Sequence, residues 1–228
     1  KKIFIFTNEH MSIVVERYNK IKSNIVSLQP IKPVNIIAVS KTFPIEHIHP
    51  LIEHGHIHYG ENKVQEAIAK WSEQKKNNQN LKLHMIGKLQ SNKAKDAVKI
   101  FDYIHSLDSQ KLADALAKHQ KNLNKNIQYF IQVNIGNEIQ KSGIPVNELD
   151  PFYNYCVNEI NLKIIGLMVI PPNDNNSVKY FNSLNELNKS LALENLSMGM
   201  STDYLDAIKH GATFVRIGSA IFGSRSLL

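Results

Sequence analysis

The 228-residue chain contains one cysteine, Cys156, so no disulfide can form within it. No apolar run approaches the roughly 20 residues of a transmembrane helix, and no segment has the layout of a signal peptide. These absences predict a cytoplasmic protein without membrane contact. The first residue is Lys1 rather than methionine, and Met11 offers a start site. We therefore expect residues 1–10 to be an extension or a cloning remnant.

Arginine is also scarce, because Arg17, Arg216 and Arg225 are the only arginines beside many lysines. The formal net charge is +7, but the lysines are scattered, and no basic stretch is interleaved with aromatic residues. This pattern predicts no nucleic-acid partner. Solvated helix faces explain most of the positive charge, and a site for anionic small molecules explains the rest.

The chain shows no compositional break that would mark a linker, and a hydrophobic share of 43% is enough for a sizeable core. We therefore predict a single domain over residues 1–228. Eight apolar segments have the pattern of strands, and a helical pattern follows each of the first seven. The predicted strands are residues 36–39, 57–60, 83–86, 101–107, 127–133, 162–170, 196–200 and 213–217.

Strict alternation of strands and helices implies parallel pairing, and eight such units in this length suit a closed (β/α)8 TIM barrel. An open doubly wound sheet is the alternative, and a phosphate site after strands seven and eight is the cue that favours the barrel. A helical stripe over residues 9–28 precedes the first strand, and we expect it to pack over one end of the core. Pro50 should kink or split the second helix.

The first predicted strand, residues 36–39, lies within the segment N-I-I-A-V-S-K (35–41), which ends with Lys41. An amine at the end of a buried strand is costly to desolvate, so its pKa falls and the neutral nucleophile becomes accessible. A Schiff-base lysine needs this property. The alternative is that Lys41 only marks where the strand leaves the core and extends its amine into water.

Two segments near the end of the chain can hold an anion. Residues 197–203, S-M-G-M-S-T-D, pass from a strand to a helix through a glycine and two hydroxyls, and residues 215–219, V-R-I-G-S, end with a glycine and a serine. Alone, Ser201 has the pattern of a helix cap. Together, the two segments predict a phosphate cradle in the units where barrels hold phosphate.

Arg216 interrupts an apolar strand, and a guanidinium inside a barrel needs hydrogen-bond partners, one of which can be a ring nitrogen. With Lys41 and the phosphate cradle, this arginine describes pyridoxal 5'-phosphate (PLP) held as a lysine aldimine. Because arginine donates a hydrogen bond without a proton to transfer, the pyridine should stay unprotonated and be a weak electron sink.

The chain carries seven motifs in a fixed order: A-V-S-K (38–41), Y-G-E-N-K-V-Q-E (59–66), H-M-I-G-K-L-Q-S-N-K (84–93), K-S-G (141–143), G-L-M (166–168), S-M-G-M-S (197–201) and V-R-I-G-S-A-I-F-G (215–223). These motifs resemble the YggS-type pyridoxal phosphate homeostasis proteins, and the resemblance covers nearly the whole chain from about Met11. It implies a fold type III PLP-binding barrel, like the N-terminal domain of alanine racemase.

The resemblance implies a set of cofactor-binding residues: Lys41, Asn62, Met200, Ser201, Arg216, Gly218 and Ser219. Lys41 is then the Schiff-base lysine, Arg216 lies near the pyridine nitrogen, and the serines and glycine of the last two units surround the phosphate. Asn62 is placed near the cofactor ring, although a turn-forming asparagine fits its position nearly as well.

Three further residues are assigned roles outside the cofactor-binding set, and no metal site is expected. His84 and His105 fall on predicted strands, where we interpret them as hydrogen-bonded core histidines. Lys141 is a loop lysine by default, and the hypothesis is that it captures the cofactor or passes it on.

The resemblance implies a protein that carries PLP, hands it to PLP-accepting apoenzymes and maintains intracellular vitamin B6 and amino-acid homeostasis. The alternative is a PLP-dependent amino-acid racemase, which needs bases on both faces of the cofactor. In alanine racemases the second base is a tyrosine from another subunit, and a C-terminal β-domain follows the barrel. Because this chain ends at Leu228, after the eighth unit, we expect a carrier rather than a racemase. The predicted barrel is complete in one chain and leaves no long apolar helix over, so we expect a monomer. A phosphate-binding barrel without an aldimine is the third hypothesis.

Overall fold

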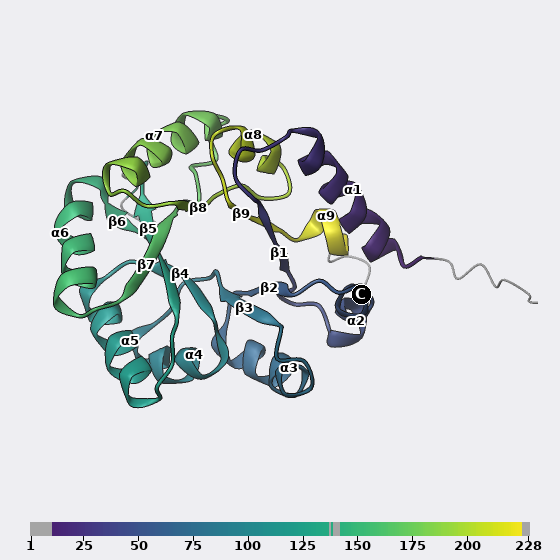
Figure 1. The fold of residues 1–228 in the computed structure, drawn as a ribbon, viewed down its shortest axis with the longest axis horizontal. Helices are drawn as coiled ribbons and strands as arrows, with labels where there is room; N and C mark the ends of the chain where they lie inside the picture. Colours follow the sequence, from purple (N-terminus) through teal and green to yellow (C-terminus); the bar gives the residue numbers. More distant parts are fainter. Residues whose placement is uncertain (1–10, 137, 139–141, 225–228) are drawn as a thin grey trace, which may run out of the picture.

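The computed structural model describes residues 11–136, 138 and 142–224. Eight of the described strands form a closed barrel in which every neighbouring pair is parallel (Figure 1). Around the barrel they are β1 (Asn35–Val39), β2 (His58–Glu61), β3 (Lys82–Met85), β4 (Tyr103–Leu107), β5 (Gln128–Asn134), β7 (Lys163–Met168), β8 (Asn195–Ser197) and β9 (Phe214–Ile217). Each predicted strand overlaps one of them, so the (β/α)8 barrel is confirmed and the open sheet is wrong.

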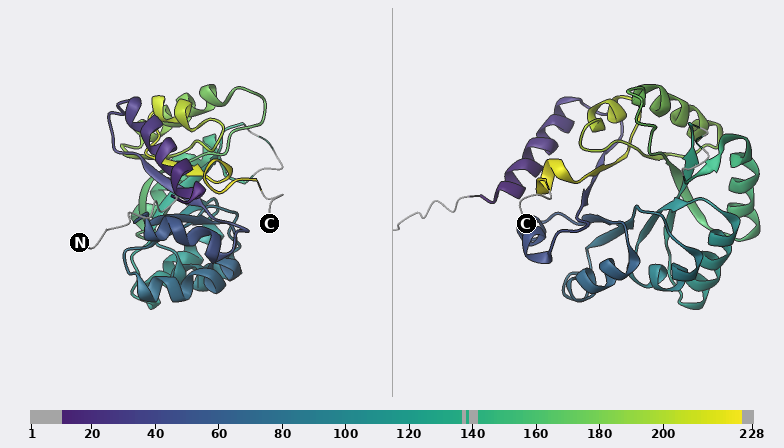
Figure 2. Two further views of the ribbon diagram at one scale, coloured as in Figure 1. Left: turned by 90° about the vertical axis from the view of Figure 1, so that its right-hand side faces the viewer. Right: turned by 180° about the vertical axis from the view of Figure 1, so that it is seen from behind.

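The helices form a ring outside the strands, seen face-on in Figure 1 and from the side and behind in Figure 2. The helices cover the outer face of the strands and the packed barrel interior covers the inner face, which explains why the strands are continuously apolar, as in β1, which is buried from Ile36 to Val39. β6 (Ile144–Pro145) only extends the end of β5. The helices are α1 (Ile13–Ser27), α2 (Ile45–Glu53), α3 (Val64–Asn77), α4 (Ala94–Ile100), α5 (Gln110–Asn122), α6 (Leu149–Asn154), α7 (Ser177–Ser190), α8 (Tyr204–Lys209) and α9 (Ser219–Phe222), with short 3-10 turns at Ser91–Lys93 and Val146–Glu148 and a π-helical turn at Tyr155–Glu159.

The position predicted for α1, over one end of the core, is wrong. α1 lies in the outer ring between α8 and α2 and packs against α9 (Figure 1). The reason is that α9, from Ser219 to Phe222, is too short to cover the seam between β9 and β1. The apolar stripe of α1, which includes Val14, Tyr18 and Ile21, covers that seam instead.

The predicted split at Pro50 is also wrong, because α2 runs unbroken from Ile45 to Glu53. Proline removes only one helical N–H, and its own carbonyl still accepts a 3.0 Å bond from the His54 N–H. On either side of it, the fully buried Ile48 and Leu51 pack into the core. This burial holds the helix together across the missing bond.

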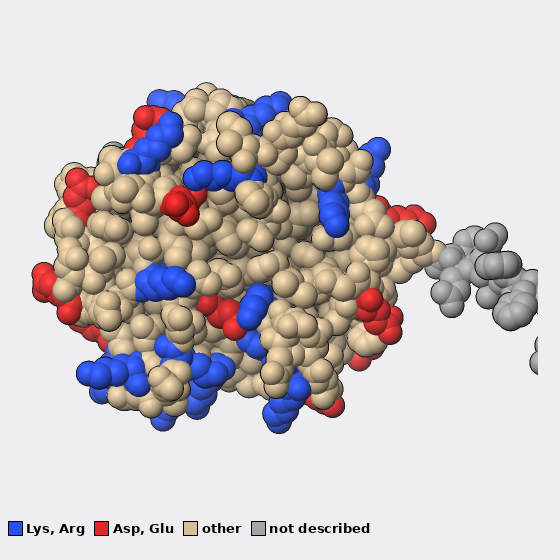
Figure 3. Space-filling model, in the orientation of Figure 1, with Lys and Arg blue, Asp and Glu red and all other residues tan. Residues whose placement is uncertain are grey.

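Parallel strands give the barrel two different faces. The C-terminal ends of the strands meet at one face, which we call the mouth, and their N-terminal ends meet at the other, which we call the floor. On the face shown in Figure 3, basic and acidic side chains are scattered over both the rim and the middle, and the basic ones gather most over α4 and α5. Within the described ranges, no helix is both long and apolar enough to cross a bilayer.

Candidate functional site

A cavity of about 400 Å³ opens at the mouth, and we call it the mouth cavity. It lies over β2, β1, β9 and β8, which are consecutive neighbours in the barrel, so their C-terminal ends meet at one place. The structure therefore brings together side chains that lie far apart in the sequence. The residues lining the cavity include every one predicted from the sequence, namely Lys41, Asn62, Met200, Ser201, Arg216, Gly218 and Ser219.

Lys41 lies two residues beyond the end of β1 and is half-buried in the wall of the mouth cavity. The chain turns sharply after it, since Thr42 has a φ of 69°, a conformation that β-branched residues rarely adopt. Phe43 is buried again directly afterwards. The lysine is therefore held between two anchored segments, β1 and the residues leading into α2.

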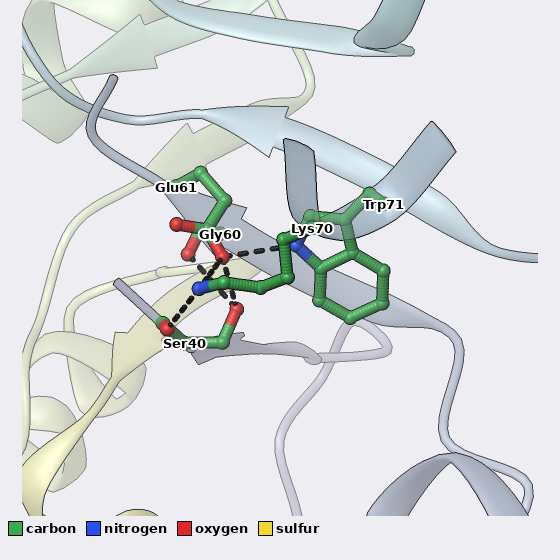
Figure 4. Close-up of polar contacts among 5 residues, drawn as sticks. All are labelled: Ser40, Gly60, Glu61, Lys70 and Trp71. Carbon is green, nitrogen blue, oxygen red and sulfur yellow. Dashed lines mark hydrogen bonds and ion pairs between the residues drawn. The ribbon is translucent and has the colours of Figure 1, made fainter. Parts of the chain in front are cut away.

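A buried polar cluster behind Lys41 was not assigned any role from the sequence (Figure 4). Glu61, at the end of β2, is fully buried, and its Oε1 accepts bonds from Ser40 Oγ at 2.7 Å, Lys70 Nζ at 2.9 Å and Trp71 Nε1 at 2.9 Å. Its Oε2 has no hydrogen-bond partner within the described ranges. We call Ser40, Glu61, Lys70 and Trp71 the Glu61 cluster.

The Glu61 cluster fixes the residue that precedes Lys41. Besides the bond from its hydroxyl to Glu61, Ser40 accepts a 2.8 Å bond at its carbonyl from Lys70 Nζ. Its N–H donates to the Gly60 carbonyl at 3.0 Å. The backbone leading into Lys41 is thus held from three directions. An acidic residue at the end of a buried strand, within the G-E-N motif, was the sequence signal for this cluster.

Arg216 lies on β9 with its guanidinium almost completely buried at the bottom of the mouth cavity. One amino group donates to Ser197 Oγ at 2.7 Å and the other to the Val169 carbonyl at 2.8 Å. Burial lowers the pKa of Arg216 to about 10, so the side chain stays charged at neutral pH. A guanidinium has five N–H groups, and its remaining ones have no hydrogen bond to the described part of the chain.

The two predicted anion-binding segments meet beside one another. Ser201 Oγ accepts bonds of 3.3 Å from the N–H groups of Gly218 and Ala220, at the start of α9. The helix-cap interpretation of Ser201 is wrong, because α8 begins only at Tyr204 and Asp203 is its N-cap residue. The Asp203 carboxylate accepts a 2.7 Å bond from the Met200 N–H, which closes this turn and leaves the serine hydroxyl to face β9.

Glycines allow the backbone to reach these positions. Gly199 has a φ of 93°, and a Cβ there would lie 2.6 Å from the Ala207 side chain, so the turn after β8 needs a glycine. A Cβ on Gly87 would collide with the backbone of Asn62. Asn62 is held by this close approach at the boundary between the mouth cavity and a neighbouring cavity of about 310 Å³.

The remaining sequence assignments have separate outcomes. His84 and His105 are fully buried and hydrogen-bonded in the barrel core, as predicted. Lys141 lies outside the described residues. Within those residues, no group of three or more histidine, cysteine, aspartate or glutamate side chains could hold a metal ion.

Fold and cavity together define a (β/α)8 barrel with a small-molecule site at its mouth, and residues 17–226 match the family described as the N-terminal domain of alanine racemase. A pyridoxal phosphate homeostasis protein of Pasteurella multocida is 38% identical over 207 residues, which is 86% of this chain and 89% of that one. One from Aquifex aeolicus is 40% identical over 199 residues, or 83% and 86% of the two chains. The chain belongs to this family of pyridoxal phosphate homeostasis proteins, which confirms the resemblance.

Solved structures agree with this assignment. PipY of Synechococcus elongatus, solved with PLP bound, is 35% identical with a TM-score of 0.82, covering 93% of this chain and 100% of that one. The alanine racemase of Clostridium difficile has a TM-score of 0.70 at 15% identity, covering 93% of this chain and 57% of that one. The racemase likeness is therefore a likeness of fold alone.

Proposed function

We propose that this protein binds PLP in the mouth cavity, holds it covalently through Lys41, and thereby maintains the intracellular supply of the cofactor. The observation that carries the proposal is the convergence of an amine, a buried guanidinium and a hydroxyl-lined backbone turn on one cavity. The relative from Synechococcus elongatus, solved with PLP bound, covers nearly the same length of chain and supports it.

The residues present fit the three chemical parts of this cofactor. Bound PLP supplies an aldehyde carbon open to an amine, a pyridine ring and a phosphate. Lys41 provides the amine, while the hydroxyls of Ser201 and Ser219 offer donors to the phosphate. The N–H groups of Gly218 and Ala220 donate to Ser201 Oγ, which leaves the proton of that hydroxyl for the anion. Arg216 offers an N–H to the pyridine nitrogen but keeps its own protons, which restrains carbanion chemistry.

The cavity lining supports holding rather than turnover. Among the described lining residues, Lys41 is the one side chain suited to act as a general base, whereas racemisation needs a base on each face. The rim is partly apolar, with Ile170 and Met200 41% and 37% exposed. We infer that this rim contacts apoenzymes that receive the cofactor, and that the protein acts as a cytoplasmic monomer.

Titration of the cofactor-free protein with PLP tests the proposal. We expect a yellow absorbance that saturates at one equivalent, and a single pyridoxyl adduct after borohydride reduction, located by peptide mass analysis on Lys41. Pyridoxal without the phosphate should bind far more weakly, because the hydroxyls of Ser201 and Ser219 lose the anion to which they donate. An adduct on a different lysine, or saturation without any adduct, would overturn the assignment.

Replacing Ser201 with alanine should weaken cofactor retention. A hydrogen bond to a charged group is worth about 1.5–3 kcal/mol, so we expect roughly 10- to 100-fold weaker retention on dialysis. Ser183→Ala, on the exposed face of α7, is the matched control and should retain the cofactor like the original protein. Equal retention by both variants would contradict the phosphate role of Ser201.

Replacing Arg216 with alanine should shift the absorbance of the loaded protein while the adduct on Lys41 still forms. The reason is that Arg216 offers its N–H groups to the ring, whereas the covalent bond is made by Lys41. Absorbance spectra recorded before borohydride reduction, with mass analysis afterwards, separate the two effects. An unchanged spectrum would place the pyridine nitrogen away from Arg216.

A further inference from the structure

A line of buried polar groups crosses the barrel from the floor to the mouth cavity. His58 Nδ1 lies 2.9 Å from His84 Nε2, and His84 Nδ1 lies 2.9 Å from His105 Nε2. His105 Nδ1 in turn lies 2.8 Å from Ser197 Oγ, which accepts a bond of 2.7 Å from Arg216. We call His58, His84, His105 and Ser197 the histidine chain.

The two ends of the histidine chain lie on opposite faces of the barrel. His58 is only half-buried and lines a cavity of about 410 Å³ at the floor, beside the start of β1. His84, His105 and Ser197 are completely buried, so His58 is the one member of the histidine chain that exchanges protons with solvent. Arg216, which contacts the other end, lines the mouth cavity.

The two central imidazoles are held rigidly and are neutral. His84 stacks on Tyr103 with a distance of 4.3 Å between the ring centroids, and His105 stacks on Phe130 with a distance of 4.4 Å. Burial lowers the pKa of both histidines well below the ordinary value. Each neutral imidazole therefore has one nitrogen that donates and one that accepts.

The charge of Arg216 fixes the direction in which these bonds run. Its N–H donates to Ser197 Oγ, so the Ser197 hydroxyl must donate elsewhere, and His105 Nδ1 is its only acceptor among the described residues. His105 then donates from Nε2 to His84, which donates from Nε2 to His58. The reverse direction would leave the buried hydroxyl of Ser197 without an acceptor, at a cost of about 1–3 kcal/mol.

We propose that the histidine chain makes the mouth cavity sensitive to protonation of His58 at the floor. His58 can gain an N–H at Nδ1 only if His84 stops donating to it, so His84 and His105 each exchange an Nε2 proton for an Nδ1 proton. Solvent supplies the one proton gained, because both central rings stay neutral. Ser197 Oγ then accepts bonds from both His105 and Arg216, and its own hydroxyl proton is left without an acceptor among the described residues. This crowding of N–H donors on one oxygen weakens the bond that holds the guanidinium.

The groups around His58 set the pH range in which it becomes protonated. Burial lowers the pKa of His58, the ammonium of Lys82 lowers it further, and the carboxylate of Asp102 raises it. The tautomer change therefore occurs when the pH falls below the ordinary pKa range of histidine. The titratable and charged groups facing His58 are Tyr18 and Lys22 of α1, His56 before β2, Lys82 and His84 of β3, and Asp102 and Tyr103 at the start of β4, with Lys75 of α3 paired to Asp102.

Histidine-ring and arginine nitrogen NMR on the cofactor-free, ¹⁵N-labelled protein tests the proposal. At neutral pH we expect the Nε2–H tautomer for His58, His84 and His105. On acidification, His84 and His105 should change to Nδ1–H, and the Arg216 Nε–H resonance should move with the same midpoint as His58. Nδ1–H tautomers at neutral pH, or an Arg216 resonance that ignores the His58 midpoint, would overturn the proposal.

His58→Gln supplies the matched variant, because its side-chain oxygen can still accept from His84 but cannot be protonated. We expect the Arg216 resonance to lose its response in this variant and to keep it in His119→Gln, which changes a histidine of α5. Identical titrations in the original protein and His58→Gln would refute the proposal. In the PLP-loaded protein, the cofactor absorbance should change with the same pH midpoint, an expectation that rests on the proposed function. Failure to bind PLP would contradict the proposed function but would not affect the NMR result on the cofactor-free protein.

Discussion

Replacing Lys41 with alanine should abolish covalent cofactor binding and leave the barrel folded. The lining of the mouth cavity contains no second lysine among the described residues, so no other amine there can take its place. Lys41 lies beyond the end of β1 and is only half-buried, so its removal takes no packed side chain from the core. Borohydride reduction followed by intact-mass measurement should show the pyridoxyl adduct in the original protein and its complete loss in the variant.

Lys63→Ala is the matched control for this experiment. Lys63 lies one residue beyond Asn62, but its side chain is 73% exposed, and among the described residues its ion-pair partner is Glu66 on the surface. The control should form the adduct to the same extent as the original protein. If Lys41→Ala still formed one adduct per chain, the covalent site would lie elsewhere, and the proposal that the mouth cavity holds PLP covalently would fail.

Lys41 and Arg216 could be found from the sequence because each breaks a strong local pattern. A cation after four apolar strand residues, or within an apolar strand, is costly unless it has a specific environment, and that cost is visible without coordinates. The alternation of strands and helices then placed both residues at the same barrel face. Local chemistry and topology together were sufficient for these two positions.

The Glu61 cluster and the histidine chain could not be predicted in the same way. Their members come from different strands and helices, and the bonds depend on side-chain directions that spacing does not encode. Ser201 shows the same limit within a single turn. Its hydroxyl could cap α8 or face β9, and the carboxylate of Asp203, two residues later, decided between them.

Replacing Glu61 with alanine should destabilise the protein more than any surface substitution. The carboxylate is completely buried, and the partner Lys70 is only 12% exposed. Without Glu61, the Lys70 ammonium, the Ser40 hydroxyl and the Trp71 N–H all lose the oxygen that they share. Breaking a buried ion pair by removing one partner costs about 3–5 kcal/mol, which is a large part of the typical stability of a domain. Urea unfolding measures the loss.

Glu66→Ala tests whether this effect belongs to burial or to the loss of any glutamate–lysine pair. Glu66 pairs with Lys63 at 2.8 Å, a distance close to that of Glu61 and Lys70, but both side chains are more than one-third exposed. An exposed pair contributes less than about 1 kcal/mol, so the control should unfold almost like the original protein. Similar losses of unfolding free energy in Glu61→Ala and Glu66→Ala would show that burial of the Glu61 cluster does not increase its contribution to stability.

Glu61→Gln separates the fold from the position of Lys41. The amide oxygen can still accept from Ser40 and Trp71, but the charge opposite Lys70 is lost, so we expect a stability between those of the original protein and Glu61→Ala. If the cluster also positions Lys41 through Ser40, this folded variant should form the pyridoxyl adduct more slowly. Adduct formation at the original rate in Glu61→Gln would restrict the cluster to a purely structural role, because Lys41 would then keep its place without the ion pair behind it.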